Sequence, residues 1–171
     1  MNSKERRNEI KKILMENDKC YKGQELADLF KVTRQVIVKD VALLRAEGLN
    51  IIATPDGYMI NKVDNNKVKK LIVTCHDYEN MEDELKIIVK YGGIVEDVIV
   101  DHLFYGEIRA MLMIKTLNDV ENFINNFNKN NANPLFLLTN GVHIHTVSTD
   151  NKENMDNIIK ELQEKNILIN I

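Results

Sequence analysis

Three amphipathic segments follow one another in residues 4–45, and the connection between the second and the third is very short. Their apolar residues recur three and four positions apart, which is the spacing of one face of an α-helix. These residues are Ile10, Ile13 and Leu14, then Leu26, Ala27 and Phe30, then Ile37, Val41 and Leu44. Because only Lys31, Val32 and Thr33 separate the second helix from the third, we expect a helix-turn-helix. Thr33 is the expected N-cap of the third helix, with its hydroxyl accepting a backbone N–H.

A short strand-turn-strand unit follows the third helix. Gly48 is expected to end that helix in the left-handed conformation, which is easily reached by glycine. Residues 49–53 and 58–60 then predict two strands, with a turn at residues 54–57 that contains Pro55 and Gly57. Three helices followed by such a hairpin, or wing, make a complete small DNA-binding fold. We therefore predict a winged helix-turn-helix domain over residues 1–62.

The exposed face of the expected third helix carries the side chains that would contact DNA. Residues 33–48 have the pattern Thr33-Arg34-Gln35-x-Ile37-x-Lys39-x-Val41-x-x-Leu44-Arg45-x-x-Gly48. This pattern resembles the winged helix of the biotin-repressor-like family, in which this helix enters the major groove. Near the start of the helix, Arg34 and Gln35 would face base edges, where Arg favours guanine and Gln favours adenine. Lys39 and Arg45 would meet phosphates, and Thr33 completes the predicted DNA-binding set. The alternative is a charged face that is only solvated or that binds protein.

The distribution of charge supports two modules with different partners. The whole chain carries a net charge of −3, which by itself argues weakly against nucleic-acid binding. Residues 1–70 hold 15 Lys and Arg against 10 Asp and Glu, whereas residues 71–171 hold 8 against 16. Phosphate contacts need local positive charge, so the basic first part matters more than the total.

The remainder of the chain predicts a second domain of mixed secondary structure. Residues 63–70 are polar without apolar periodicity, so we place a linker there and the second domain at residues 71–171. Strands are expected at residues 71–75, 94–100, 108–114, 142–148 and 167–169, and helices at 80–91, 118–130 and 152–165. Helices collected on one face of a mainly antiparallel sheet give an open α/β sandwich. The predicted fold class is therefore α+β, in two domains.

All four histidines lie in this second domain. His143 and His145 are two residues apart in an expected strand, so their side chains share one face and can offer two imidazoles to one metal ion. His76 follows the first expected strand, and Glu84 lies eight residues later on a helix, where its carboxylate would complete the set. Such ligands suit zinc, nickel or ferrous iron. Taken singly, each histidine is more often a structural or exposed residue.

The second domain contains several longer motifs, which are His76, Met81-Glu82-Asp83-Glu84-Leu85-Lys86-x-Ile88-Val89, Gly92-Gly93, His102-x-x-Tyr105-Gly106 and Pro134-Leu135-x-x-Leu138-Thr139-x-Gly141-Val142-His143-x-His145-Thr146. They resemble the three-histidine domain of bacterial nicotinate-responsive repressors of NAD biosynthesis and niacin uptake, which also follows a winged helix. The resemblance implies an HPr-like fold that binds a divalent metal, and His76, Glu84, His143 and His145 match the family's ligand positions. This chain departs from the family at Leu103, where proline is usual, and at Asn140.

The same resemblance places His102 and Tyr105 near the metal cavity, where they would contact an aromatic acid by stacking or hydrogen bonding. The alternative is that Tyr105 only packs and Gly106 only serves a tight turn. The effector's carboxylate or its pyridine nitrogen could bind the metal, and the sequence does not choose between them.

The resemblance implies a repressor of NAD-biosynthesis or niacin-uptake genes with nicotinate as effector, and we expect a cytoplasmic protein. A homodimer is expected on a double-stranded DNA operator, because one winged helix reads a single half-site. No stretch approaches the roughly 20 apolar residues that cross a membrane. A metal-responsive regulator, in which the metal itself is the signal, is the alternative function. An enzyme is least favoured, because residues 71–171 contain no glycine-rich phosphate loop and only one serine, Ser148.

Overall fold

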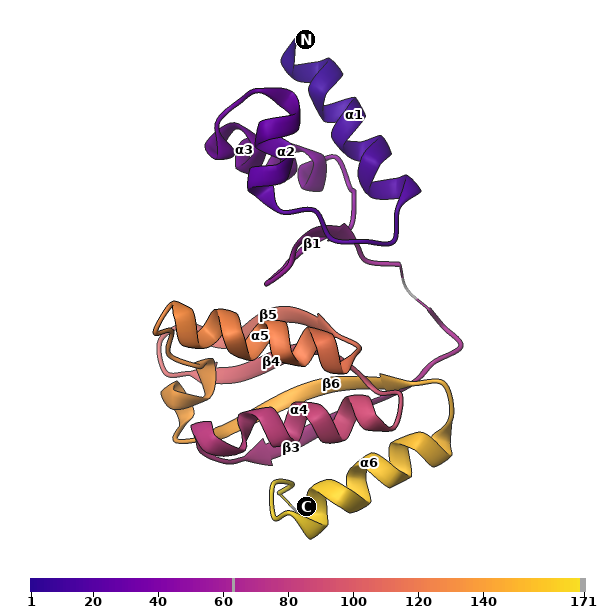
Figure 1. Cartoon of the computed structure of the whole chain (residues 1–171), viewed down its shortest axis with the longest axis vertical. Helices are drawn as coiled ribbons and strands as arrows, with labels where there is room; N and C mark the ends of the chain where they lie inside the picture. The colour runs from indigo at the N-terminus through magenta and orange to yellow at the C-terminus, as the bar shows by residue number, and fades with distance from the viewer. Residues whose placement is uncertain (63, 170–171) are drawn as a thin grey trace. The chain divides into compact units, whose positions relative to one another are not determined.

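The computed structural model describes residues 1–62 and 64–169. The chain divides after residue 63 into two compact units, each drawn with its own helices and strands in Figure 1. None of the helices within the described residues is long and apolar enough to cross a membrane.

The first unit is a three-helix domain with a two-stranded wing. Helices α1 (Ser3–Glu16), α2 (Gly23–Phe30) and α3 (Arg34–Ala46) precede strands β1 (Ile51–Thr54) and β2 (Gly57–Ile60), which pair antiparallel. The predicted apolar faces meet in one buried cluster, made of Ile10, Leu14, Leu26, Ala27, Ile37, Val41, Leu44 and Ile51. Between α2 and α3, Lys31 adopts a left-handed conformation, and this permits the tight turn. The winged helix-turn-helix predicted from the sequence is therefore confirmed.

A close backbone contact holds the wing against the helices. Tyr21 and Tyr58 exchange two backbone hydrogen bonds of 2.9 Å, which join the α1–α2 connection to β2. Beside them, Gly57 has a φ of +132°, and a Cβ atom there would lie 2.4 Å from the carbonyl oxygen of Tyr21. Only glycine fits this position without a shift of the backbone.

A buried ion pair joins the first helix to the third. Asp40 of α3 is 2% exposed. Its carboxylate accepts a hydrogen bond of 2.6 Å from Nε of Arg6, and Arg7 lies 3.9 Å away. The position of α1 across α3 is thus fixed by charge as well as by apolar packing.

The second unit is a four-stranded antiparallel sheet with helices over one face (Figure 1). Its strands are β3 (Val68–Cys75), β4 (Ile94–His102), β5 (Gly106–Ile114) and β6 (Val142–Thr149), in the spatial order β3-β6-β4-β5. Its helices are α4 (Met81–Lys90), α5 (Leu117–Lys129) and α6 (Lys152–Glu164), with short 3-10 helices η1 (Tyr78–Asn80) and η2 (Leu135–Thr139). This is the open antiparallel α/β sandwich that the sequence predicts.

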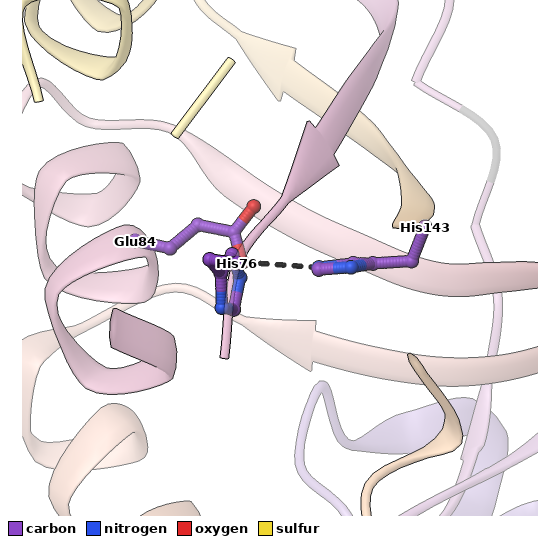
Figure 2. A group of neighbouring side chains, drawn as sticks. All are labelled: His76, Glu84 and His143. Atoms are coloured by element: carbon purple, nitrogen blue, oxygen red, sulfur yellow. Dashed lines mark hydrogen bonds and ion pairs between the residues drawn. The ribbon is translucent and has the colours of Figure 1, made fainter. Parts of the chain in front are cut away.

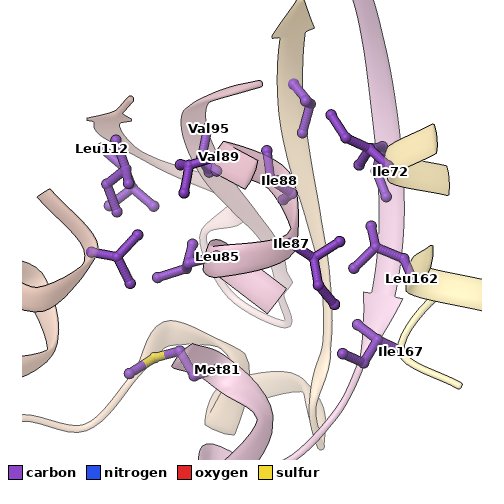
Figure 3. Packing of buried hydrophobic residues seen from close by; sticks show 14 of the residues in the cluster. Ile72, Met81, Leu85, Ile87, Ile88, Val89, Val95, Leu112, Leu162 and Ile167 are labelled. Atoms are coloured by element: carbon purple, nitrogen blue, oxygen red, sulfur yellow. The ribbon is translucent and has the colours of Figure 1, made fainter. Parts of the chain in front are cut away.

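The core of the second unit lies between the sheet and the helices. Figure 3 shows Leu85 and Ile88 of α4 among side chains from the strands and from α6, including Val95, Leu112 and Leu162. Apolar residues with helical spacing on α4 and with alternate spacing on β4 supply the two sides of this layer.

Most boundaries differ from the predicted ones by only one or two residues, and two segments differ more. Strand β3 already begins at Val68, inside the stretch predicted as linker, because Lys69 and Lys70 conceal the alternation of an edge strand. Residues 167–169 were predicted as a strand, whereas the structure has a single bridge between Leu168 and Thr74. This segment is tied to β3 by only a few backbone bonds, such as the 2.9 Å bond from Ile169 N–H to the Val73 carbonyl.

Candidate metal centre and nucleic-acid interface

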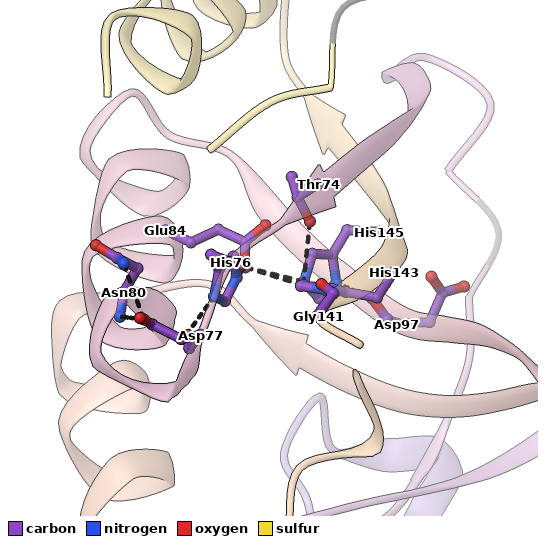
Figure 4. A network of polar contacts seen from close by, with 9 residues as sticks. All are labelled: Thr74, His76, Asp77, Asn80, Glu84, Asp97, Gly141, His143 and His145. Carbon is purple, nitrogen blue, oxygen red and sulfur yellow. Dashed lines mark hydrogen bonds and ion pairs between the residues drawn. The ribbon is translucent and has the colours of Figure 1, made fainter. Parts of the chain in front are cut away.

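Three secondary-structure elements bring four polar side chains into the interior of the second unit. His143 and His145 lie on β6, and both are buried on the same face, as the two-residue spacing predicts. His76 directly follows β3, the neighbouring strand, and Glu84 lies on α4, which packs over the sheet. Figure 2 shows His76, Glu84 and His143 converging, and Figure 4 adds His145 and the surrounding polar residues.

One carboxylate oxygen is the meeting point of the three imidazoles. Oε2 of Glu84 lies 2.7 Å from Nε2 of His76, 3.2 Å from Nε2 of His143 and 3.4 Å from Nε2 of His145. Glu84 is 1% exposed, and the three histidines are 9%, 2% and 3% exposed in sequence order. A charged group at this depth requires a partner of opposite charge.

Backbone carbonyls fix the orientation of each ring. Nδ1 of His76 lies 2.6 Å from the carbonyl of Asp77, Nδ1 of His143 lies 2.9 Å from that of Gly141, and Nδ1 of His145 lies 2.6 Å from that of Asp97. A carbonyl only accepts, so each Nδ1 must carry the hydrogen. Each neutral ring therefore turns an Nε2 lone pair toward Glu84, which is the arrangement that supporting hydrogen bonds give to metal-binding histidines.

Gly141 is the residue that allows this loop to approach the first histidine. Its φ is +91°, and a Cβ atom there would lie 2.6 Å from the carbonyl oxygen of His76. It follows Asn140, which is also left-handed with a φ of 52°, so the chain turns sharply from η2 into β6. This turn places the side chain of His143 in the histidine cluster.

The ionisation of the cluster is strongly coupled. Burial raises the pKa of Glu84, but the three histidines outweigh this effect and hold it well below its ordinary value. Burial lowers the pKa of His76 and of His145, but their contacts with Glu84 outweigh it and leave both raised. A cation is thus favoured where the Nε2 atoms and the carboxylate meet, whether it is a proton or a metal ion.

The donor set fits a divalent transition metal. Among the described residues, ligand atoms of His76, Glu84 and His143 lie within 4.8 Å of one another, and His145 contacts the same carboxylate. The second oxygen of Glu84, Oε1, is buried with no hydrogen-bond partner among the described residues, so it has an unused lone pair. The hydroxyl of Thr74, 3.1 Å from Nε2 of His143, would have to turn its hydrogen away to free that nitrogen. Three imidazoles and one carboxylate suit zinc, nickel or ferrous iron.

A small cavity adjoins this cluster, but the predicted effector residues are not part of it. Glu84, His143 and His145 form part of its lining, and neither His102 nor Tyr105 does. The structure places both at the β4–β5 hairpin, where Tyr105 is 80% exposed. Nδ1 of His102 accepts backbone N–H bonds from Phe104 and Tyr105 at 3.2 and 3.3 Å, so it stabilises the turn. In this chain the two residues are not brought together with the four predicted metal ligands.

On the first unit, the predicted DNA-contacting side chains are exposed on α3. Arg34, Gln35 and Lys39 point to solvent, whereas Nε of Arg45 donates a 2.8 Å hydrogen bond to the carbonyl of Ile51 and also supports the wing. Thr33 is the N-cap residue, but its hydroxyl makes no capping bond, which corrects that part of the prediction. Its carbonyl instead accepts a hydrogen bond of 3.0 Å from the backbone N–H of Val36.

Sequence reasoning missed one residue that holds the site together. Asp97 on β4 is 1% exposed, and besides orienting His145 through its carbonyl, its carboxylate accepts bonds of 2.8 and 3.0 Å from the backbone and hydroxyl of Thr146. Arg109 of β5 lies 3.0 Å from the same carboxylate. Its position could have indicated this role, because Asp97 is an acidic residue within the apolar run of the strand expected at residues 94–100.

A winged helix-turn-helix joined to a buried histidine-carboxylate centre defines a two-domain DNA-binding regulator. Residues 6–59 match the HTH domain family, and residues 69–171 match the 3H domain family. The chain is 39% identical over 165 residues to the probable transcription repressor NiaR of Thermotoga maritima, covering 96% of this chain and 94% of that protein. It is 36% identical over 167 residues to the transcription repressor NadR of Bacillus subtilis, covering 96% and 93%.

The chain therefore belongs to the 3H-domain family of transcription repressors, together with NiaR and NadR. This confirms the family expected from the sequence motifs. Both relatives are named as transcription repressors and neither as an enzyme, in agreement with the sequence-based expectation.

Proposed function

We propose that this chain represses genes of NAD biosynthesis or niacin uptake, with nicotinate as its effector and a divalent metal as part of the effector site. The observation that carries the proposal is the convergence of three Nε2 atoms on Glu84, with every Nδ1 held by a backbone carbonyl. His76, Glu84, His143 and His145 would hold the ion. When bound, the ion supplies a Lewis-acidic position for an anionic ligand.

A homodimer is part of the proposal, because one winged helix contacts one half-site of double-stranded DNA. The effector would favour the dimer arrangement that matches the spacing of two half-sites, which requires different affinities for the two arrangements. The working location of such a complex is the cytoplasm.

The test is operator binding by the full chain in four conditions: chelated or loaded with one metal, each with and without nicotinate. The proposal predicts tighter operator binding only when metal and nicotinate are both present. Unchanged affinity on adding nicotinate to the metal-loaded protein would rule out the effector role.

The second candidate is a regulator for which the metal is the signal. The four candidate ligands are buried, and backbone carbonyls orient the three histidine rings. Such a centre can bind a metal strongly without another ligand, which favours this second function. It predicts that metal alone changes operator affinity and that nicotinate adds nothing, so the same four conditions separate the two functions.

A further inference from the structure

The outer face of α3 carries a stripe of uncharged side chains, formed by Gln35, Val38 and Ala42. These residues are three and four positions apart, so they lie on successive turns of one side of the helix. All three are exposed, whereas the buried residues of α3 lie on the opposite side, against the core of the first unit. This uncharged stripe is therefore part of the surface that α3 presents to a partner.

The two arginines of α3 lie beside the uncharged stripe, on the side of the wing. Nε of Arg45 donates to the carbonyl of Ile51, and its guanidinium carbon lies 6.0 Å from the ring centroid of Tyr58. Arg34 and Tyr58 both border Gly23, because a Cβ atom added there would lie 3.5 Å from Nε of Arg34 and 3.4 Å from Cε2 of Tyr58. At this position between α3 and the wing, a guanidinium is suited to a phosphate of the DNA backbone. The base edges are then left to the uncharged stripe.

An exposed apolar side chain on this face has one chemical partner in the major groove. Adenine, guanine and cytosine present hydrogen-bonding atoms there, whereas thymine also presents its apolar 5-methyl group. The side chain of Val38 cannot form hydrogen bonds, so a contact with this methyl group is the favourable interaction that it can make. A β-branched side chain is nearly fixed in one rotamer within a helix, so little conformational entropy is lost in the contact. Ala42, one turn further along α3, has only a methyl group and leaves room for the floor of the groove.

We propose that Val38 reads the 5-methyl group of a thymine in the operator half-site, beside the base pair that Gln35 contacts. The centre of the half-site is then composed of A·T pairs, because glutamine pairs best with adenine. Arg34 binds the DNA backbone in this arrangement, in place of the guanine edge that the sequence pattern suggests. The inference extends the DNA binding of the repressor family and depends on neither the metal nor the effector.

The experiment first selects duplexes from a pool of random sequence, using the full chain with whichever combination of metal and nicotinate gives the tightest binding. Each thymine of the selected half-site is then replaced in turn by uracil, which removes the methyl group and leaves the base pairing unchanged. Affinities are measured for the wild type, for Val38→Ala and for Leu43→Ala. Leu43 is another exposed apolar residue of α3, but it lies outside the uncharged stripe, so Leu43→Ala is the matched control.

The quantity compared is the ratio of the affinities for the thymine and uracil duplexes. Each ratio is formed with one protein, so a loss of folding stability in a variant cancels. In the wild type, uracil at the position facing Val38 should weaken binding about threefold to fivefold, the effect of exposing one methyl-sized group. In Val38→Ala the same replacement should cost less than about twofold, because most of the apolar contact is already lost. Leu43→Ala should keep the ratio of the wild type.

Three results would overturn the proposal. They are equal affinity of the wild type for thymine and uracil at every position, a uracil effect of the same size in the wild type and Val38→Ala, and selected half-sites that share no A·T pair. A uracil effect that is also lost in Leu43→Ala would count against it, because the contact would then not be specific to Val38.

This proposal and the proposed effector role can fail separately. A uracil effect that depends on Val38, without any response of DNA binding to nicotinate, would support the thymine contact and refute the effector role. A nicotinate response without a uracil effect would do the reverse. Failure to select any duplex would refute both.

Discussion

Replacing Gly141 with alanine tests the tight approach that builds the histidine cluster. Two effects add at this position. An L-residue at a φ of +91° is strained by about 1–2 kcal/mol. A Cβ atom 2.6 Å from the carbonyl oxygen of His76 also forces the backbone apart, which costs about 1–3 kcal/mol. The second unit should therefore lose about 2–5 kcal/mol of unfolding free energy.

Gly106→Ala is the matched control. Gly106 is also left-handed, with a φ of +68°, but no heavy atom lies within 4 Å of the added Cβ. It should lose only the strain of about 1–2 kcal/mol. Both replacements restrict the unfolded chain in the same way, so the difference between them isolates the contact with His76.

The assay is urea unfolding followed by pulsed hydrogen exchange, read on peptides from β4 and β6 so that the second unit is followed separately. Metal affinity measured in parallel should fall in Gly141→Ala and remain in Gly106→Ala, since only the former moves the loop that positions His143. Equal destabilisation by the two replacements would refute the argument from close approach.

Three further outcomes follow from the structure. Asp40→Ala should destabilise the first unit by about 1.5–3 kcal/mol, the value of a hydrogen bond to a charged group, and wild-type exchange in α1 peptides would contradict this. Gln35→Ala should reduce the preference for one operator base pair by about 1–3 kcal/mol of binding free energy. Lys39→Ala should instead weaken binding to all DNA sequences alike and lower the slope of log affinity against log salt concentration by about 1. A uniform loss of affinity in both variants would reject the assignment of base and phosphate contacts. As the pH is lowered, metal affinity should begin to fall above about pH 6.5, the ordinary pKa of an imidazole. The pKa values of His76 and His145 are raised, so protons compete with the metal at a higher pH than they would at an ordinary imidazole. A pH-independent affinity would speak against these ligands.

The fold was predictable where one local pattern dominates. The spacing of Ile37, Val41 and Leu44 specifies both the helix and its buried face, and Gly48 marks its end with a φ of +94°. Interactions distant in sequence were not visible in this way. Asp40 lies in the middle of α3, and only the folded chain brings Arg6, 34 positions away, to its carboxylate. Likewise, the charged start of β3 is a strand only because β6 pairs with it.

The candidate metal site was also predictable from local spacing but not from contacts between residues distant in sequence. The two-residue spacing of His143 and His145 places both rings on one face, which is a local property of a strand. The carbonyls that orient His76 and His143 come from residues one and two positions away in the sequence. The carbonyl that orients His145 comes from Asp97 on a neighbouring strand, and this contact cannot be read from spacing. His102 and Tyr105 were expected at the cavity from resemblance, but the structure places them at a hairpin turn outside the cavity lining, with His102 half-buried and Tyr105 exposed.

Metal titration of the chelator-treated full chain tests the central claim most directly, and it needs no knowledge of the operator. Wild-type protein should bind one divalent ion per chain, while Glu84→Gln, which removes the charge shared by three imidazoles, should bind at least about tenfold more weakly. Glu82→Gln on the same helix, where Glu82 pairs with Lys86 at 2.6 Å, should bind as the wild type. Equal metal affinity in wild type and Glu84→Gln would contradict the assignment of this cluster as the metal centre.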